Sequence, residues 1–239
     1  MKISLVVPAY NESKRIIHTL EEATYYMKSH FECYEIIIVD DGSTDDTVAI
    51  AETFSNLGVK VLKQPHAGKG KTLKSGILAA TGDYIFFTDA DLPYALDNIE
   101  VAIKHFKDET TALVIGARDL YHAENGIPYP FYRNIMSKAF SFIVNLFLNL
   151  DVKDTQCGFK AFKKDTAHTL FPLVEINGFG FDIELLKIAR INHLKIVRIP
   201  VKLMHSSGSK VNPFKDSIKM LRDIKTVYKN AKRGLYEIR

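Results

Sequence analysis

Tryptophan is absent from the 239-residue chain, and cysteine occurs only at Cys33 and Cys157. Two cysteines supply neither a disulfide framework nor a set of thiolate metal ligands, and they favour a reducing compartment. No stretch reaches the ~18 consecutive apolar residues of a membrane span. The first apolar run is too short for a signal peptide, and Pro8 interrupts it. We therefore expect neither a disulfide-stapled nor a membrane-spanning chain.

Positive charge exceeds negative charge only slightly, with 32 Lys and Arg against 28 Asp and Glu, a formal net charge of +4. This balance suits an anionic small ligand or a membrane surface and does not call for nucleic acid. Hydrophobic residues make up 46% and charged residues 25% of the chain, close to the globular average, which excludes wholesale disorder. The length predicts one large domain, or one domain with an appendage.

Short apolar runs alternate with segments of helical periodicity through the first half of the chain. This alternation is typical of βαβ units, and it predicts a mostly parallel sheet with helices on both faces. A further strand over 195–201 and a helix over 182–191 are expected later. The expected early strands are 3–7, 34–39, 59–62, 84–88 and 112–116, and the expected early helices are 13–28, 43–54, 72–81 and 96–106.

Polar residues follow four of these strands, in the segments 10–12, 40–43, 89–91 and 118–119. The carboxyl ends of parallel strands meet at one edge of a sheet, and ligands of such sheets bind there. We therefore expect these four segments to gather at a single site.

The tripeptide Asp89-Ala90-Asp91 directly follows the apolar run YIFFT. Two carboxylates separated by one residue can share a divalent cation where the backbone turns. Mg²⁺ and Mn²⁺ prefer such oxygen ligands and keep positions for phosphate oxygens. A solvated turn that caps the next helix is the alternative, but the position after a buried strand favours the metal site.

Two adjacent carboxylates, Asp40 and Asp41, end the second expected strand. They repel one another, so an arrangement without a ligand or capping partner is costly. A carboxylate here can accept a hydrogen bond from a base N–H or a ribose hydroxyl. Capping of the next helix by Ser43 or Asp45 is the simpler interpretation, but it leaves the two strand-end carboxylates unexplained.

The turn GKGKT (68–72) resembles the end of a phosphate-binding P-loop. The P-loop pattern requires a glycine where this chain has Pro65, and we reject that interpretation. The turn still places Lys69 and Lys71 at the start of a helix, where they can face an anionic ligand. Cations also stabilise the negative charge that develops on a leaving diphosphate. For each single candidate cation below, the alternative interpretation is a solvated charge at the protein surface. The candidates for this role are Arg118, Arg133, Lys160 and Lys210.

Six motifs occur in the order seen in family 2 glycosyltransferases. They are VVPAYNE (6–12), VDDGSTD (39–45), the GKG turn (68–76), GDYIFFTDAD (82–91), GAR (116–118) and DTQCGFKAF (154–162). Residues 3–210 therefore resemble that family, which has the GT-A fold. Within it, GFGFDIELL (178–186) and HSSGSKVNPF (205–214) are most similar to the dolichyl-phosphate glucosyltransferase group, followed by the dolichyl-phosphate mannose synthases.

The resemblance implies an α/β fold of the GT-A type, with a mostly parallel central sheet flanked by helices. It divides the glycosyltransferase domain (1–212) into a Rossmann-like nucleotide-sugar-binding half (1–118) and an acceptor-binding half (119–212). A basic amphipathic helix (213–239) would follow, with Phe214, Ile218, Leu221, Ile224 and Tyr228 near one face.

Roles for individual residues follow from the same resemblance. Asp89, Ala90 and Asp91 would form the metal and diphosphate site, and the place of a third ligand found in mannose synthases is taken by Pro93. Lys69 and Arg118 would contact the nucleotide sugar. Arg133, Lys160 and Lys210 would contact the diphosphate or the acceptor phosphate. The nucleoside would be held by Pro8, Tyr10, Glu12, Val39 and Asp41.

The implied chemistry is an inverting transfer of a hexose from a nucleotide diphosphate sugar such as UDP-glucose to a polyprenyl phosphate. Glucose is the favoured sugar, and mannose is the next candidate. Mg²⁺ or Mn²⁺ would stabilise the leaving nucleotide. The acceptor phosphate is already an anion, so positioning and charge neutralisation matter more than a strong base. Asp154 resembles an aspartate sometimes given a base role, and orientation of Lys160 or Arg133 is its alternative role.

A lipid acceptor also fits the apolar stretch 135–150 and the basic C-terminal segment, which would together dock on an anionic membrane surface. We expect a cytoplasmic protein that is peripheral at the cytoplasmic face of the membrane or held there by a partner. A C-terminal helix packed on the core is the alternative for that segment. Two other functions stay open: a family 2 transferase with a soluble or polysaccharide acceptor, and a non-catalytic nucleotide-sugar-binding protein.

Overall fold

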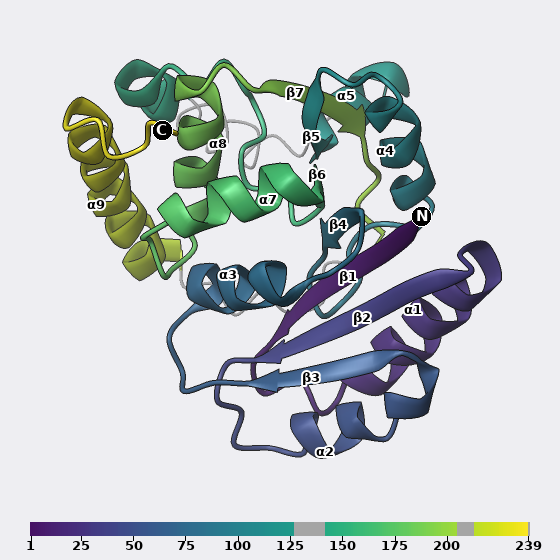
Figure 1. Ribbon diagram of the computed structural model, residues 1–239. Helices are drawn as coiled ribbons and strands as arrows, with labels where there is room; N and C mark the ends of the chain where they lie inside the picture. Colours follow the sequence, from purple (N-terminus) through teal and green to yellow (C-terminus); the bar gives the residue numbers. More distant parts are fainter. Residues whose placement is uncertain (127–141, 205–212, 239) are drawn as a thin grey trace.

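The computed structural model describes residues 1–126, 142–204 and 213–238. Within these residues the centre of the molecule is a seven-stranded sheet with the order β3-β2-β1-β4-β6-β5-β7 (Figure 1). The strands are β1 (Lys2–Ala9), β2 (Cys33–Asp40), β3 (Val59–Lys63), β4 (Tyr84–Phe87), β5 (Thr111–Ala117), β6 (Lys160–Lys163) and β7 (Lys195–Pro200).

Strand β6 is the one strand among these seven that the sequence did not predict. It is only four residues long and begins and ends with lysine, so no apolar run marks it. It pairs antiparallel with β4 and with β5, whereas the other pairs in the sheet are parallel. The sheet is therefore mostly parallel, as predicted, and β6 joins the part that contains β1–β4 to the part that contains β5 and β7.

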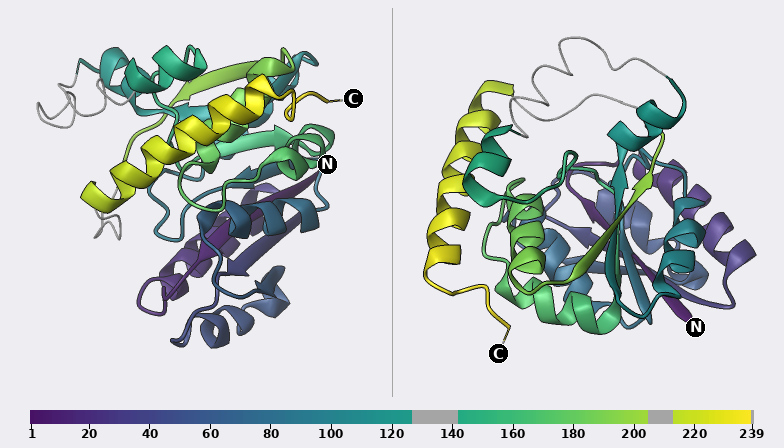
Figure 2. Two further views of the ribbon diagram at one scale, coloured as in Figure 1. Left: turned by 90° about the vertical axis from the view of Figure 1, so that its left-hand side faces the viewer. Right: turned by 90° about the horizontal axis from the view of Figure 1, so that it is seen from above.

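Helices cover both faces of the sheet (Figure 2). Successive side chains of a strand point to opposite faces, and β1 shows this directly. Val6 packs in the core cluster beneath α3, α7 and α8, while Leu5 and Val7 pack in the cluster beneath α1 and α4. The helices are α1 (Ile16–His30), α2 (Thr47–Glu52), α3 (Lys69–Ala79), α4 (Asn98–Phe106), α5 (Arg118–Glu124), α7 (Lys164–Leu170), α8 (Phe181–Ile191) and α9 (Pro213–Lys232), with short 3₁₀ turns at Ser55–Leu57 and Phe171–Leu173.

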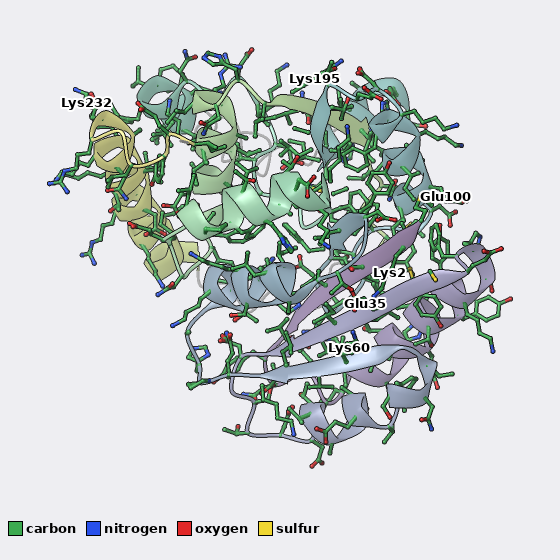
Figure 3. All side chains as sticks on the ribbon, viewed as in Figure 1. Lys2, Glu35, Lys60, Glu100, Lys195 and Lys232 are labelled. Carbon is green, nitrogen blue, oxygen red and sulfur yellow. The ribbon has the colours of Figure 1, made fainter. Side chains whose placement is uncertain are left out.

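A buried carboxylate ties the first strands together. Glu35 of β2 is 3% exposed and pairs with Lys60 of β3 at 2.7 Å and with Lys2 of β1 at 3.5 Å (Figure 3). It also accepts hydrogen bonds from the Ser4 hydroxyl and from the main-chain N–H of Thr81. Burial alone would raise the pKa of Glu35, but these hydrogen bonds outweigh it and lower the pKa well below its usual range.

Helix α9 packs on the core rather than standing clear of it. Ile224 and Val227 are buried, whereas Leu221, expected on the same face, is half exposed. The apolar face is therefore rotated by about one residue from the one predicted. Among the residues that the structure describes, no helix combines the length and apolarity needed to cross a bilayer.

Candidate active site

The carboxyl ends of β1, β2 and β4 bring three of the four predicted polar segments together, those at 10–12, 40–43 and 89–91. The main-chain N–H of Asp41 donates to the carbonyl of Ala9 at 2.9 Å, which joins the ends of β2 and β1. The Thr19 hydroxyl, at the start of α1, donates to the carbonyl of Ala90 just beyond β4 at 2.5 Å. Arg15 links the same segments, because its guanidinium lies 2.6 Å from Glu12 and 3.7 Å from Asp91.

The Asp89-Ala90-Asp91 segment presents its carboxylates to cationic side chains. Lys69, the first residue of α3, places its ammonium 2.5 Å from Oδ1 of Asp89. Burial of Lys69 disfavours its charge, but Asp89 and Asp182 outweigh that effect and raise the pKa of Lys69. Burial and the neighbouring Asp89 raise the pKa of Asp91. A cation near both carboxylates would relieve this cost.

Two carboxylates alone make a partial metal site. Within residues 1–126, 142–204 and 213–238, no three His, Cys, Asp or Glu side chains gather closely enough to hold a metal ion by themselves. The hard oxygen donors of Asp89 and Asp91 suit Mg²⁺ or Mn²⁺, which readily takes its remaining ligands from water and phosphate oxygens. The residues present therefore fit a cation that binds together with a diphosphate.

At the end of β2, the two adjacent aspartates have different partners. Asp40 accepts from the main-chain N–H groups of Gly42 and Ser43 and so fixes the turn. Asp41 faces the loop between β3 and α3, where its carboxylate accepts from the N–H groups of Ala67 at 2.8 Å and Gly68 at 3.0 Å. The repulsion expected between the two carboxylates is thus offset by separate sets of donors.

The remaining nucleoside candidates lie along β1 and β2. Tyr10 is 37% exposed, and its ring stacks on that of His66 with the centroids 4.4 Å apart. Pro8 and Val39 pair with one another in the β1–β2 register, close to the rim, and Val39 is fully buried. Glu12 is nearly buried against Arg15.

Arg118 and Asp154 form a fixed pair at the end of β5. The guanidinium of Arg118 donates through Nε at 2.8 Å and Nη2 at 2.7 Å, and the Arg118 main-chain N–H donates at 3.0 Å. Burial would raise the pKa of Asp154, but Arg118 outweighs burial and lowers it. Asp154 is therefore ionised and orients Arg118, whereas Lys160 is paired with Asp182.

The predicted contact of Lys160 with a phosphate is wrong for a physical reason. Its side chain is fully buried, and its ammonium lies 2.5 Å from Asp182 and 2.8 Å from the carbonyl of Cys157. It also lies over the ring of Phe87, 5.4 Å from the centroid. Lys160 thus holds β6 to the start of α8 beneath the site. Arg133 and Lys210 lie outside the described residues.

Three contributors to the site were missed in the sequence. Arg15 follows Glu12 by three residues, a spacing that brings side chains together on a helix and was the available signal. Gly158 lies against the carboxylate of Asp89, and His66 lies against Asp41. No local sequence pattern indicates either contact, because each joins segments far apart in the chain.

Known proteins match this architecture. The sequence model of glycosyl transferase family 2 matches residues 4–171. The chain belongs to this family. The family resemblance predicted from the motifs is confirmed.

Curated relatives in glycosyl transferase family 2 are similar over nearly the whole chain. A dolichyl-phosphate beta-glucosyltransferase from Dictyostelium discoideum is 32% identical over 99% of this chain and 77% of its own length. A protein of the same name from Drosophila melanogaster is 34% identical over 100% of this chain and 78% of its own length.

Solved structures confirm the predicted GT-A fold. Glucosyl-3-phosphoglycerate synthase from Mycobacterium tuberculosis, in complex with Mn²⁺, UDP and glucosyl-3-phosphoglycerate, superposes with a TM-score of 0.68. The identity is 21%, and the match covers 95% of this chain and 78% of the other. At this identity the likeness concerns the fold alone.

Proposed function

We propose that this protein transfers glucose from a nucleotide diphosphate sugar, UDP-glucose in the first place, to a dolichyl-type polyprenyl phosphate. The observation that carries the proposal is the pair Asp89 and Asp91, directed at Lys69 and Arg15 at the rim of the sheet. The near-full-length similarity to dolichyl-phosphate beta-glucosyltransferases supports the choice of sugar and acceptor.

The nucleoside binds at the ends of β1 and β2. Asp41 offers a carboxylate to a base N–H, and Tyr10 offers an aromatic face on which a base can stack. The main-chain N–H groups of the loop between β3 and α3 hold Asp41, so its carboxylate is in place before the donor arrives.

The diphosphate binds where positive charge converges. Asp89 and Asp91 would hold Mg²⁺ or Mn²⁺, which supplies Lewis-acid stabilisation of the leaving nucleotide. Lys69, at the N-terminus of α3, adds positive charge beside Asp89, and we assign Arg118, which Asp154 orients, to the same diphosphate. Charge that is oriented before reaction stabilises the transition state without reorganisation.

No side chain needs to remove a proton from the acceptor. A polyprenyl phosphate is an anion at neutral pH and attacks the anomeric carbon directly, so the transfer inverts the configuration there. Asp154 remains ionised and paired with Arg118, and it acts by positioning that cation.

The acceptor lipid reaches the site at a membrane surface. Phe142, Leu146 and Phe147 in the helical segment 142–148 are more than half exposed. The ring centroids of Phe147 and of Tyr228 in α9 lie 6.4 Å apart with the rings edge to face, so this apolar segment lies beside the basic helix (Figure 2). The exposed basic residues of α9 are Lys219, Arg222, Lys225, Lys229 and Lys232. Apolar insertion beside clustered bases is the pattern of peripheral binding to anionic lipid.

Organic extraction tests the proposal. The protein is incubated with Mn²⁺ or Mg²⁺, polyprenyl phosphate and radiolabelled UDP-glucose or GDP-mannose. We expect label from UDP-glucose in the lipid phase and none with Asp91→Asn. Asp83→Asn, at an exposed carboxylate near the N-terminus, serves as the matched control and retains activity. Hydrolysis of the donor without labelling of the lipid would contradict the proposal that a polyprenyl phosphate is the acceptor. Binding of the donor without any turnover would contradict the proposal that the protein is an enzyme.

The membrane step has its own test. We expect sedimentation of the protein with anionic vesicles at low salt, and loss of it in a variant with Phe142 and Leu146 replaced by Ser. Deletion of α9 is unsuitable, because Ile224 and Val227 are part of the core. Equal sedimentation of the variant and the parent would contradict docking through this surface.

A further inference from the structure

The loop between β3 and α3 places an imidazole over the nucleoside candidates. The His66 ring stacks on Tyr10 with a centroid separation of 4.4 Å and an angle of 29° between the planes. Its Nδ1 lies 2.9 Å from Oδ2 of Asp41 and 3.1 Å from the main-chain carbonyl of the same residue. The His66 side chain therefore contacts both the Tyr10 ring and the Asp41 carboxylate, the two groups that we propose bind the nucleobase.

These two contacts are the ones that a uracil ring would make. A pyrimidine stacks through its flat face, and its ring N–H donates to a carboxylate. An imidazole with a proton on Nδ1 offers the same pair of features on a smaller ring. The His66 ring and the base cannot both occupy the face of Tyr10 and the Oδ2 atom of Asp41 in this way.

We propose that His66 is a placeholder for the nucleobase: its ring fills the base site when no donor is bound and rotates outward when the base enters. This inference rests on the proposed function, since it takes Tyr10 and Asp41 as the nucleoside-binding groups. It assigns to His66 control over donor affinity, through competition rather than through contact with the reacting atoms.

The main chain of the loop is anchored, so the motion belongs to the side chain. Asp41 also binds the N–H groups of Ala67 and Gly68, and the N–H of Gln64 donates to the carbonyl of Asp40 at 3.1 Å. Gly42 has a φ of +78°, and a Cβ at this position would stand 2.7 Å from the main-chain nitrogen of His66. The turn after β2 and the loop before α3 are therefore in close contact. The His66 side chain is 59% exposed and has solvent to rotate into.

Rotation frees one acceptor without disturbing the rest of the site. Oδ1 of Asp41 keeps the N–H of Ala67, and Oδ2 exchanges the imidazole N–H for the base N–H. The conformer with the ring in place cannot bind the base, and this lowers the apparent affinity by the fraction of protein in the open conformer. Removing the ring therefore strengthens donor binding.

Calorimetric titration with UDP in the presence of Mn²⁺ tests this. We expect His66→Ala to bind UDP about three- to tenfold more tightly than the parent, the range for the loss of one competing hydrogen bond and stack. His66→Phe keeps a stacking ring but no N–H, and its affinity should lie between the two. His105→Ala, the same change at an exposed histidine at the end of α4, should leave the affinity unchanged.

A nuclear Overhauser contact between the rings of His66 and Tyr10 gives a second, independent readout. It should be present in the free protein and lost on saturation with UDP. Weaker or equal UDP binding by His66→Ala, or a ring contact that persists with UDP bound, would overturn the placeholder role while leaving the donor site intact. Absence of UDP binding by every variant and by the parent would overturn the donor site itself, and this inference with it.

Discussion

Gly158 and Asp89 are in such close contact that a Cβ on Gly158 would stand 2.2 Å from Oδ2 of Asp89. The glycine comes from the segment before β6, and the aspartate follows β4, the strand with which β6 pairs. The absence of a side chain at position 158 thus creates the space that the carboxylate occupies.

Replacing Gly158 by Ala should push the Asp89 carboxylate away from Lys69 and lower kcat about a hundredfold, because small displacements at a reacting centre cost this much. Steady-state kinetics and thermal unfolding together check this. Gly178→Ala is the matched control, since its Cβ would meet only the flexible end of Lys219. Wild-type turnover in Gly158→Ala would mean that the position of Asp89 does not matter.

The pair Arg118 and Asp154 should behave as one unit. Asp154→Asn weakens the hold on the guanidinium, and we expect kcat/KM to fall about tenfold to a hundredfold, with a similar fall for Arg118→Lys. The double variant should lose little more than either single one, because contacting residues are non-additive. If Asp154 were instead a base, the two losses would add, and the Asn variant would flatten the pH–rate profile.

Acid should weaken the β1–β2–β3 region through Glu35. The folded-state pKa of this carboxyl is lowered, so its contribution to stability is complete above its unfolded pKa of about 4.3 and is lost as the pH falls below that value. Glu35→Gln should cost roughly 1–3 kcal/mol at pH 7 and reduce the pH dependence of unfolding below pH 4.3. Denaturant titrations at pH 7 and pH 3.5 measure both. An unchanged difference between the two pH values would contradict this role.

The buried ion pair of Lys160 and Asp182 makes a distinct prediction. Lys160→Met leaves a buried carboxylate without its ammonium partner and should destabilise the fold by about 3–5 kcal/mol. The double variant with Asp182→Asn should recover much of that loss. Thermal and denaturant unfolding of the three variants provide the measurement, and equal losses in the single and double variants would show that the charge pairing is unimportant.

The sequence predicted the parallel sheet and the gathering of polar segments because both follow from local patterns. Apolar runs mark β1, β2 and β4, and the chain direction brings their carboxyl ends to one edge. Strand β6 could not be found this way, since it exists only through its pairing with β4 and β5.

The side-chain partners were harder to predict than the fold. Lys160 was predicted to contact a phosphate, but its ammonium is buried and pairs with the distant Asp182. Asp41 was expected to accept a hydrogen bond from a nucleobase, whereas in this structure its carboxylate accepts from main-chain N–H groups of the loop 64–68. Both outcomes depend on contacts between segments more than 20 residues apart, which composition and periodicity do not report.

The central claim is that Asp89 and Asp91 hold a divalent cation together with the donor diphosphate. Calorimetric titration of UDP with and without Mn²⁺ tests it most directly, on the parent, on Asp91→Asn and on the Asp83→Asn control. We predict that Mn²⁺ strengthens UDP binding at least tenfold in the parent and in the control, and that this gain disappears in Asp91→Asn. The same Mn²⁺-dependent gain in Asp91→Asn would contradict the claim.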